Sequence, residues 1–161
     1  ALMTKEPEGP WYHEMLDLGY NYRITDLQCA LGLSQFRKLD SFVKRRREIA
    51  DIYNKEFSVI DGIRPAPKNS GHAYHLYPVW VDPNIRKELF IKLRENNIGV
   101  QVHYIPVHLQ PFYRNKFDYK KGDYPVVEKY YSGEISLPMF PSLNSEDIAF
   151  ILSLFQKYVK A

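Results

Sequence analysis

The stretch 19–35 most constrains how this chain folds, because a polar, aromatic loop runs directly into the start of a helix. Thr25 is a favourable N-cap, and Asp26 places a negative charge near the positive end of the helix. Gln28 stands three residues after Thr25, where it completes a capping box. The sequence therefore predicts a helix over residues 25–38 with a defined N-terminus.

The apolar residues of this first helix are not confined to one stripe. They form two rows, Ile24 with Leu27 and Leu31, and Ala30 with Leu33 and Phe36. Small residues between the rows (Ala30, Gly32 and Ser34) would let a second backbone come close. Because a helix usually buries a single stripe, two apolar sides predict a helix that lies between subunits or domains.

Composition narrows the class of protein. At 161 residues, 45% hydrophobic and 15% aromatic, the chain can fill a core and is not a disordered protein. A net charge of +3 suits a binder of small anions as well as an ordinary soluble protein, and does not by itself indicate nucleic acid. The single cysteine, Cys29, cannot form an internal disulfide, and we expect a small buried apolar residue in a reducing compartment.

Two further features of the whole chain bear on its location. No segment approaches the apolar length of a membrane span and no signal peptide is visible, so we expect a cytoplasmic protein with no membrane partner. The chain begins Ala-Leu-Met, without an initiator methionine at the front. We therefore expect it to be a piece of a longer protein.

A second helix is predicted over residues 41–57, and it carries the basic run 44–47. At the helical period Arg46 falls inside the apolar stripe while Lys44 and Arg47 point elsewhere. We expect Arg46 to be clearly more buried than Lys44, against a carboxylate or along the core. Binding of nucleic acid through this run is the least favoured of the functional hypotheses.

From residue 73 onward, strands and helices alternate, which predicts an α+β fold with a short, mostly antiparallel sheet. The expected elements are strands at 73–81, 99–104 and 134–138 and helices at 82–96, 125–132 and from 145 onward. In the second strand Val100, Val102 and Tyr104 should face one way, and Gln101 and His103 the other. The predicted organisation is an irregular segment with a loop (1–23), interface helices (24–58) and a small C-terminal domain (59–161).

The residues themselves leave the chemistry open. His72 and His75 would project to opposite faces of a strand, and no cysteine pair accompanies them, so no metal site is predicted. No nucleophile elbow or glycine-rich phosphate loop is present. His103, followed by a Pro-rich loop with His108, suits either hydrogen bonding to a ligand or a structural role. Asn21 and Arg23, before a helix N-terminus, would suit an anion or else a turn and a surface pair.

Several motifs together resemble one known family, the DegT/DnrJ/EryC1/StrS sugar aminotransferases, which use pyridoxal phosphate. The motifs appear in the family's order and cover nearly the whole chain; they are Gly-Tyr-Asn-Tyr-Arg-Ile-Thr-Asp-Leu-Gln at 19–28, Arg-Arg-Glu-Ile-Ala at 46–50 with Tyr53, His-Leu-Tyr-Pro at 75–78, Gly-Val-Gln-Val-His-Tyr-Ile-Pro-Val-His at 99–108 and Ile-Ser-Leu-Pro at 135–138. The stretch 99–113 looks most like the branch that acts in pseudaminic-acid biosynthesis.

The resemblance implies the C-terminal small domain of a fold-type-I enzyme, preceded by a long helical segment. It implies that Asn21 contacts the cofactor phosphate of the other subunit of a homodimer, and that Tyr22, Arg23, His103, Tyr104 and His108 lie near the substrate. The lysine that holds the cofactor would lie upstream, so no catalytic residue is expected in this chain, which alone should be inactive. One departure, Asn96-Asn97 in place of the usual glycine, affects only a helix cap.

The activity implied for the intact enzyme is transfer of an amino group, from glutamate, to a UDP-linked 4-keto-6-deoxy sugar for surface glycans. The rival hypothesis is a non-catalytic sugar-binding or regulatory module of the same fold. An exposed apolar side of the first helix would also make the chain self-associate.

Overall fold

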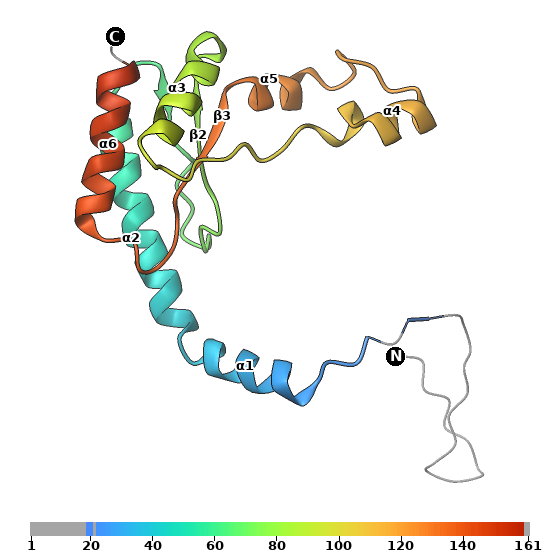
Figure 1. Cartoon of the computed structure of the whole chain (residues 1–161), viewed down its shortest axis with the longest axis vertical. Helices are drawn as coiled ribbons and strands as arrows, with labels where there is room; N and C mark the ends of the chain where they lie inside the picture. The colour runs from blue at the N-terminus through green and yellow to red at the C-terminus, as the bar shows by residue number, and fades with distance from the viewer. Residues whose placement is uncertain (1–18, 21, 160–161) are drawn as a thin grey trace. The chain divides into compact units, whose positions relative to one another are not determined.

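The structure of the chain is a computed structural model, which describes residues 19–20 and 22–159. The described chain divides into two units, one that ends at Arg37 and one that begins at Lys38 (Figure 1). In its described part, the first unit contains α1 (Asp26–Phe36). The second unit contains α2 (Leu39–Phe57), β1 (Ile63–Arg64), β2 (Tyr77–Val81), α3 (Pro83–Glu95), η1 (Val107–Leu109), α4 (Pro111–Phe117), α5 (Pro125–Gly133), β3 (Glu134–Leu137) and α6 (Ser145–Val159).

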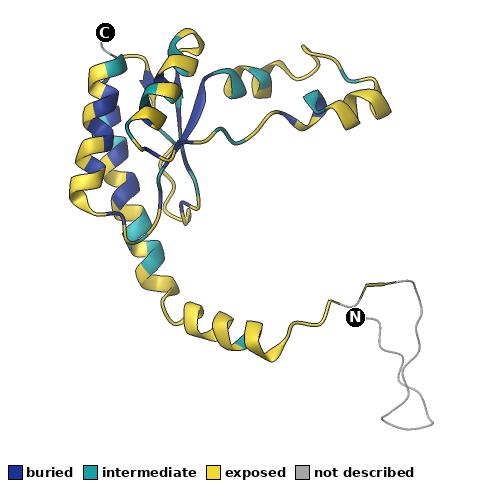
Figure 2. Ribbon diagram, viewed as in Figure 1, coloured by how far each residue is buried: buried dark blue, intermediate teal, exposed yellow. Residues whose placement is uncertain are grey.

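The N-terminus of α1 is fixed by the predicted capping box. The Thr25 hydroxyl accepts a hydrogen bond from the Gln28 amide at 3.3 Å, and the Gln28 side chain accepts one from the Thr25 amide at 2.9 Å. No residue of α1 is buried in the described structure, and Leu27 is 85% exposed (Figure 2). Cys29 is half-buried, so the expectation of a buried cysteine is wrong. Both apolar rows of α1 are left uncovered by described residues.

The second unit is built on a three-stranded antiparallel sheet in the order β1-β2-β3, which confirms the predicted α+β class. In β2, residues Tyr77, Val79 and Val81 are buried and alternate with half-buried Pro78 and Trp80, because successive side chains of a strand point to opposite faces. The buried residues belong to the core that α2 and α6 complete.

Aromatic side chains form the centre of this core. Tyr53 lies 4.9 Å from Tyr77, and Phe57 lies 5.0 Å from Phe155, measured between ring centroids. Burial raises the pKa of both Tyr53 and Tyr77. These contacts pack α2 against both β2 and α6. The sheet is therefore a rigid base for the loops that follow it.

The basic run of α2 anchors chain segments. Arg46 is half-buried and Lys44 is exposed, which confirms their predicted order of burial. The partners of Arg46 are backbone carbonyls, and not the carboxylate that was one of the two expected surroundings. Its guanidinium donates to the carbonyls of Met139 at 2.6 Å and of Tyr74 at 3.0 Å. Arg45 and Arg47 likewise donate to carbonyls, at Leu143 and His72. The three guanidinium groups therefore fasten two loops to α2.

Two predicted strands differ from the structure. The strand expected at 73–81 begins only at Tyr77, because Tyr74 has a φ of +48° and its amide donates to the His72 ring instead of a ladder. The strand expected at 99–104 is absent from the described chain, apart from a bridge between Gln101 and Ser136.

Strand pairing ends after Gln101 for a specific reason. The His103 amide donates to the Glu134 carboxylate at 2.8 Å, so this amide cannot pair with a neighbouring strand. The predicted facing also fails, because Val100 is buried while Tyr104 is 71% exposed. Asn97, just after α3, has the left-handed conformation that commonly ends a helix, with a φ of +61°. Among the described residues, no helix is long and apolar enough to span a membrane.

Candidate functional site

The predicted site residues divide between the two units. Asn21 lies outside the described residues. Tyr22 and Arg23 belong to the first unit and are exposed, and Ile24 separates them from Thr25, the N-cap of α1. Arg23 forms no ion pair with a described acid. The capping box pairs the Gln28 amide and the Cys29 amide donates to the Thr25 carbonyl, so the Asp26 and Leu27 amides are the first-turn donors of α1 without a partner among the described residues. Arg23, three residues before Asp26 in the sequence, adds an exposed guanidinium. That set of donors suits a phosphate.

His103 and Tyr104 follow the point where the bridge to β3 ends. The Glu134 carboxylate is only 1% exposed, and it accepts hydrogen bonds from the His103 amide and from the Ser136 hydroxyl. The His103 Nδ1 atom is buried without a hydrogen-bond partner among the described residues. The ring of Tyr104 lies 4.6 Å from that of His103 and is mostly exposed. Glu134 therefore fixes the backbone from which both rings project.

His108 lies on the short helix η1 and is buried. Its Nε2 atom lies 2.9 Å from the Oε1 atom of Glu128 on α5. An ionised carboxylate accepts hydrogen bonds but cannot donate them, so Nε2 carries the proton. This contact holds the imidazole in one tautomer and one orientation.

The Glu128 carboxylate has further partners. It accepts hydrogen bonds from the Gly122 amide at 2.8 Å and from the Tyr124 amide at 3.4 Å. The hydrogen bond with His108, followed by that from Gly122, lowers the pKa of Glu128. One carboxylate thus ties η1, the loop before α5 and α5 itself together.

These contacts form the frame of an aromatic pocket of about 460 Å³. Its lining residues are Pro106, Val107, His108, Tyr113, Phe117, Tyr119, Tyr124 and Val127. The rings form a continuous series: centroid distances are 4.8 Å from His108 to Tyr124, 5.9 Å from Tyr124 to Tyr119, and 5.9 Å from Tyr119 to Phe117. A pocket with aromatic walls and a few polar groups suits a flat or ring-shaped ligand.

The pocket includes one of the three substrate residues predicted in this unit. His108 lines it, whereas neither His103 nor Tyr104 does. Sequence reasoning missed Tyr119, because the segment 117–123 reads only as a surface loop. It also missed Tyr124, which directly precedes the helix predicted at 125–132, and Glu128, which is seen only as a member of that helix. The available signal was the density of aromatic residues between 112 and 124, which a mere loop does not need.

The described residues contain no cluster of three or more His, Cys, Asp or Glu side chains able to hold a metal ion. The polar chemistry of the site therefore rests on His108, Glu128 and the tyrosine hydroxyls, which can orient a ligand through hydrogen bonds.

Comparison with known proteins identifies relatives of this chain. The sequence profile of the DegT/DnrJ/EryC1/StrS aminotransferase family matches residues 3–156. The spore coat polysaccharide biosynthesis protein SpsC of Bacillus subtilis is 42% identical over 159 residues, which is 94% of this chain and 41% of SpsC. The UDP-4-amino-4,6-dideoxy-N-acetyl-beta-L-altrosamine transaminase of Campylobacter jejuni is 38% identical over 152 residues, 88% of this chain and 38% of that enzyme.

Solved structures share the fold. Spr1654 of Streptococcus pneumoniae, a protein assigned to the sugar aminotransferases and solved in its PMP form, superposes with a TM-score of 0.86 at 26% identity. The match covers 98% of this chain and 42% of Spr1654. The chain thus spans about two fifths of the length of the relatives it matches.

Proposed function

The chain belongs to the DegT/DnrJ/EryC1/StrS aminotransferase family, and we propose that it forms part of a pyridoxal-phosphate enzyme that aminates a nucleotide-linked keto sugar. The relatives support this substrate class, since the Campylobacter jejuni enzyme is named for a UDP-linked amino sugar. Our finer proposal is a UDP-linked 4-keto-6-deoxy sugar as acceptor and glutamate as amino donor. A cytoplasmic location is part of the same proposal.

The observation that carries the proposal is the aromatic pocket around His108, because it lies in the part of the chain that we expect, from the family resemblance, to be near the substrate. Its rings supply surfaces for stacking a uracil or a sugar, and His108, whose Nε2 proton is directed at Glu128, supplies an acceptor at Nδ1. Tyr22, Arg23, His103 and Tyr104 remain proposed substrate contacts.

Pyridoxal phosphate, when bound, supplies the electron sink that lets an amino group move between donor and acceptor. The described residues would hold part of it, since Arg23 and the Asp26 and Leu27 amides of α1 are donors suited to its phosphate. We propose that Asn21, two residues before Arg23, adds an amide donor to the cofactor phosphate of a second subunit. The lysine that holds the cofactor is not among the residues we assign.

A homodimer is the second part of the proposal. The uncovered apolar rows of α1 support it, because Leu27, Leu31 and Phe36 are all more than half exposed. Sedimentation analysis should therefore show a dimer that Leu31→Asp weakens and that Lys38→Asp, on the same exposed segment, leaves intact. A wild-type monomer at all concentrations tested would contradict it.

The test of the reaction uses the full-length protein that contains this chain, loaded with pyridoxal phosphate. Glutamate should bleach the visible absorbance of the bound cofactor, and a UDP-linked 4-keto-6-deoxy sugar should restore it. Asn21→Ala should weaken retention of the cofactor more than binding of the sugar nucleotide. Binding of the sugar nucleotide with no glutamate-dependent change in absorbance would favour a non-catalytic module.

A further inference from the structure

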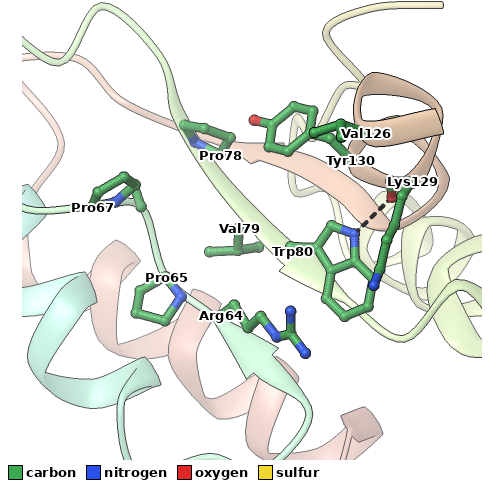
Figure 3. A pocket seen from close by; sticks show the side chains of 10 residues that line it. Arg64, Pro65, Pro67, Pro78, Val79, Trp80, Val126, Lys129 and Tyr130 are labelled. Carbon is green, nitrogen blue, oxygen red and sulfur yellow. Dashed lines mark hydrogen bonds between the residues drawn. The ribbon is translucent and has the colours of Figure 1, made fainter. Parts of the chain in front are cut away.

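A second cavity lies between β1, β2 and α5, and it shares no lining residue with the aromatic pocket (Figure 3). Its volume is about 400 Å³, which lies within the range of small-molecule sites. The lining residues are Arg64, Pro65, Ala66, Pro67, Pro78, Val79, Trp80, Val126, Lys129 and Tyr130. None of the substrate or cofactor residues assigned above is among them.

Trp80 forms a fixed wall of this cavity. Its indole N–H donates to the Lys129 carbonyl at 3.1 Å, as the dashed line in Figure 3 shows. The end of α5 is pressed against the ring as well, since a Cβ added to Gly133 would lie 2.6 Å from the indole nitrogen. The indole therefore cannot turn without moving α5 away from β2.

Two cationic residues, Arg64 and Lys129, line this cavity. The guanidinium of Arg64 lies over the Trp80 ring, 4.7 Å from its centroid, and the ring face attracts it. Neither cation forms an ion pair with a described acid, and none of the lining residues is acidic.

The rest of the cavity is apolar. Pro65, Pro67 and Pro78 form one side, and Val126 and Tyr130 on α5 form the other. Val126 is 84% exposed. An apolar cavity with two uncompensated cations in its lining favours a ligand that has an apolar body and a negative group.

We propose that this cavity binds a small amphipathic anion, with a single ring between Pro78 and Tyr130 and a carboxylate or phosphate on Arg64. The planar guanidinium, steadied from behind by Trp80, presents its N–H groups in the fork that both anions accept bidentately. Lys129 adds a second positive charge without that directional preference.

The test uses the fluorescence of Trp80. This chain contains two tryptophans, Trp11 and Trp80, so Trp11→Phe leaves Trp80 as its one tryptophan. In that background, phenyl phosphate and phenylacetate are titrated separately, which shows which anion the cavity prefers. Each should change the emission saturably, and Arg64→Gln should raise the Kd about tenfold, with a smaller rise for Lys129→Gln.

Lys87→Gln is the matched control, because it removes one exposed positive charge from α3 and should leave the Kd unchanged. Benzyl alcohol has the ring but no negative charge, and inorganic phosphate has the charge but no ring. Both should bind more weakly than phenyl phosphate and phenylacetate. The proposal is overturned if the titration does not saturate, if Arg64→Gln behaves like Lys87→Gln, or if inorganic phosphate binds as well as phenyl phosphate. The measurement needs neither pyridoxal phosphate nor a sugar nucleotide, so its failure is separable from failure of the proposed reaction.

Discussion

His108 and Glu128, 20 residues apart in sequence, meet at 2.9 Å and hold the aromatic pocket together. The same carboxylate receives the amides of Gly122 and Tyr124. We expect Glu128→Ala to release the loop 118–124, so that these two amides exchange with solvent several-fold faster in hydrogen-exchange mass spectrometry.

Two matched variants sharpen that result. Glu128→Gln keeps an acceptor oxygen and should show a smaller increase in exchange. Glu88→Ala removes an exposed carboxylate from α3 and should leave the loop unchanged. Equal exchange in the alanine variant and the wild type would show that Glu128 does not hold the loop.

The Glu128 carboxyl also predicts a dependence of stability on pH. Its pKa in the folded protein is lowered from 4.5, mainly by the hydrogen bond with His108. A carboxyl with a lowered folded-state pKa stabilises the fold above its unfolded pKa and loses that effect as pH falls through the folded value. The difference in Tm between wild type and Glu128→Gln should therefore be constant near neutral pH and shrink below about pH 4.5. A difference that grows on acidification contradicts this assignment.

Arg46 predicts a large effect on stability from a single side chain. Arg46→Met keeps much of the aliphatic length but leaves the carbonyls of Met139 and Tyr74 without their charged donor. Because hydrogen bonds to charged groups contribute more than neutral ones, we expect a loss of about 2–3 kcal/mol in urea unfolding. Lys44→Met, two residues earlier and exposed, should change the free energy of unfolding by less than about 0.5 kcal/mol.

At Gly133 the backbone of α5 lies so close to β2 that a larger residue should destabilise the protein. A Cβ at this position would lie 2.2 Å from the Val81 carbonyl oxygen, and backbone cannot yield as a flexible side chain can. Gly133→Ala should destabilise the protein by about 2–3 kcal/mol and alter the emission of Trp80. Gly99→Ala is the control, because nothing lies within 4 Å of its added Cβ. A Gly133→Ala protein as stable as this control would refute the close packing of α5 on β2.

Local sequence signals determined the elements whose causes are local. The capping box at Thr25, the N-cap Asp82 before α3, the left-handed Asn97 and the apolar stripe of α6 each act within a few residues, and the structure contains all of them. The strand predicted at 99–104 failed for the opposite reason. Its length was decided by Glu134, more than 30 residues away, which takes the His103 amide out of the ladder.

The sequence by itself determined the α+β class, most of the helices and the family, because apolar periodicity and the order of the motifs are properties of the residue order alone. Only the tertiary structure decided which side chains meet. It paired His108 with Glu128, assigned Arg46 to backbone carbonyls instead of a carboxylate, and brought Arg64 over Trp80. These contacts join residues that are 16 to 93 positions apart. Their formation depends on how the sheet and helices pack, and no local pattern encodes that packing.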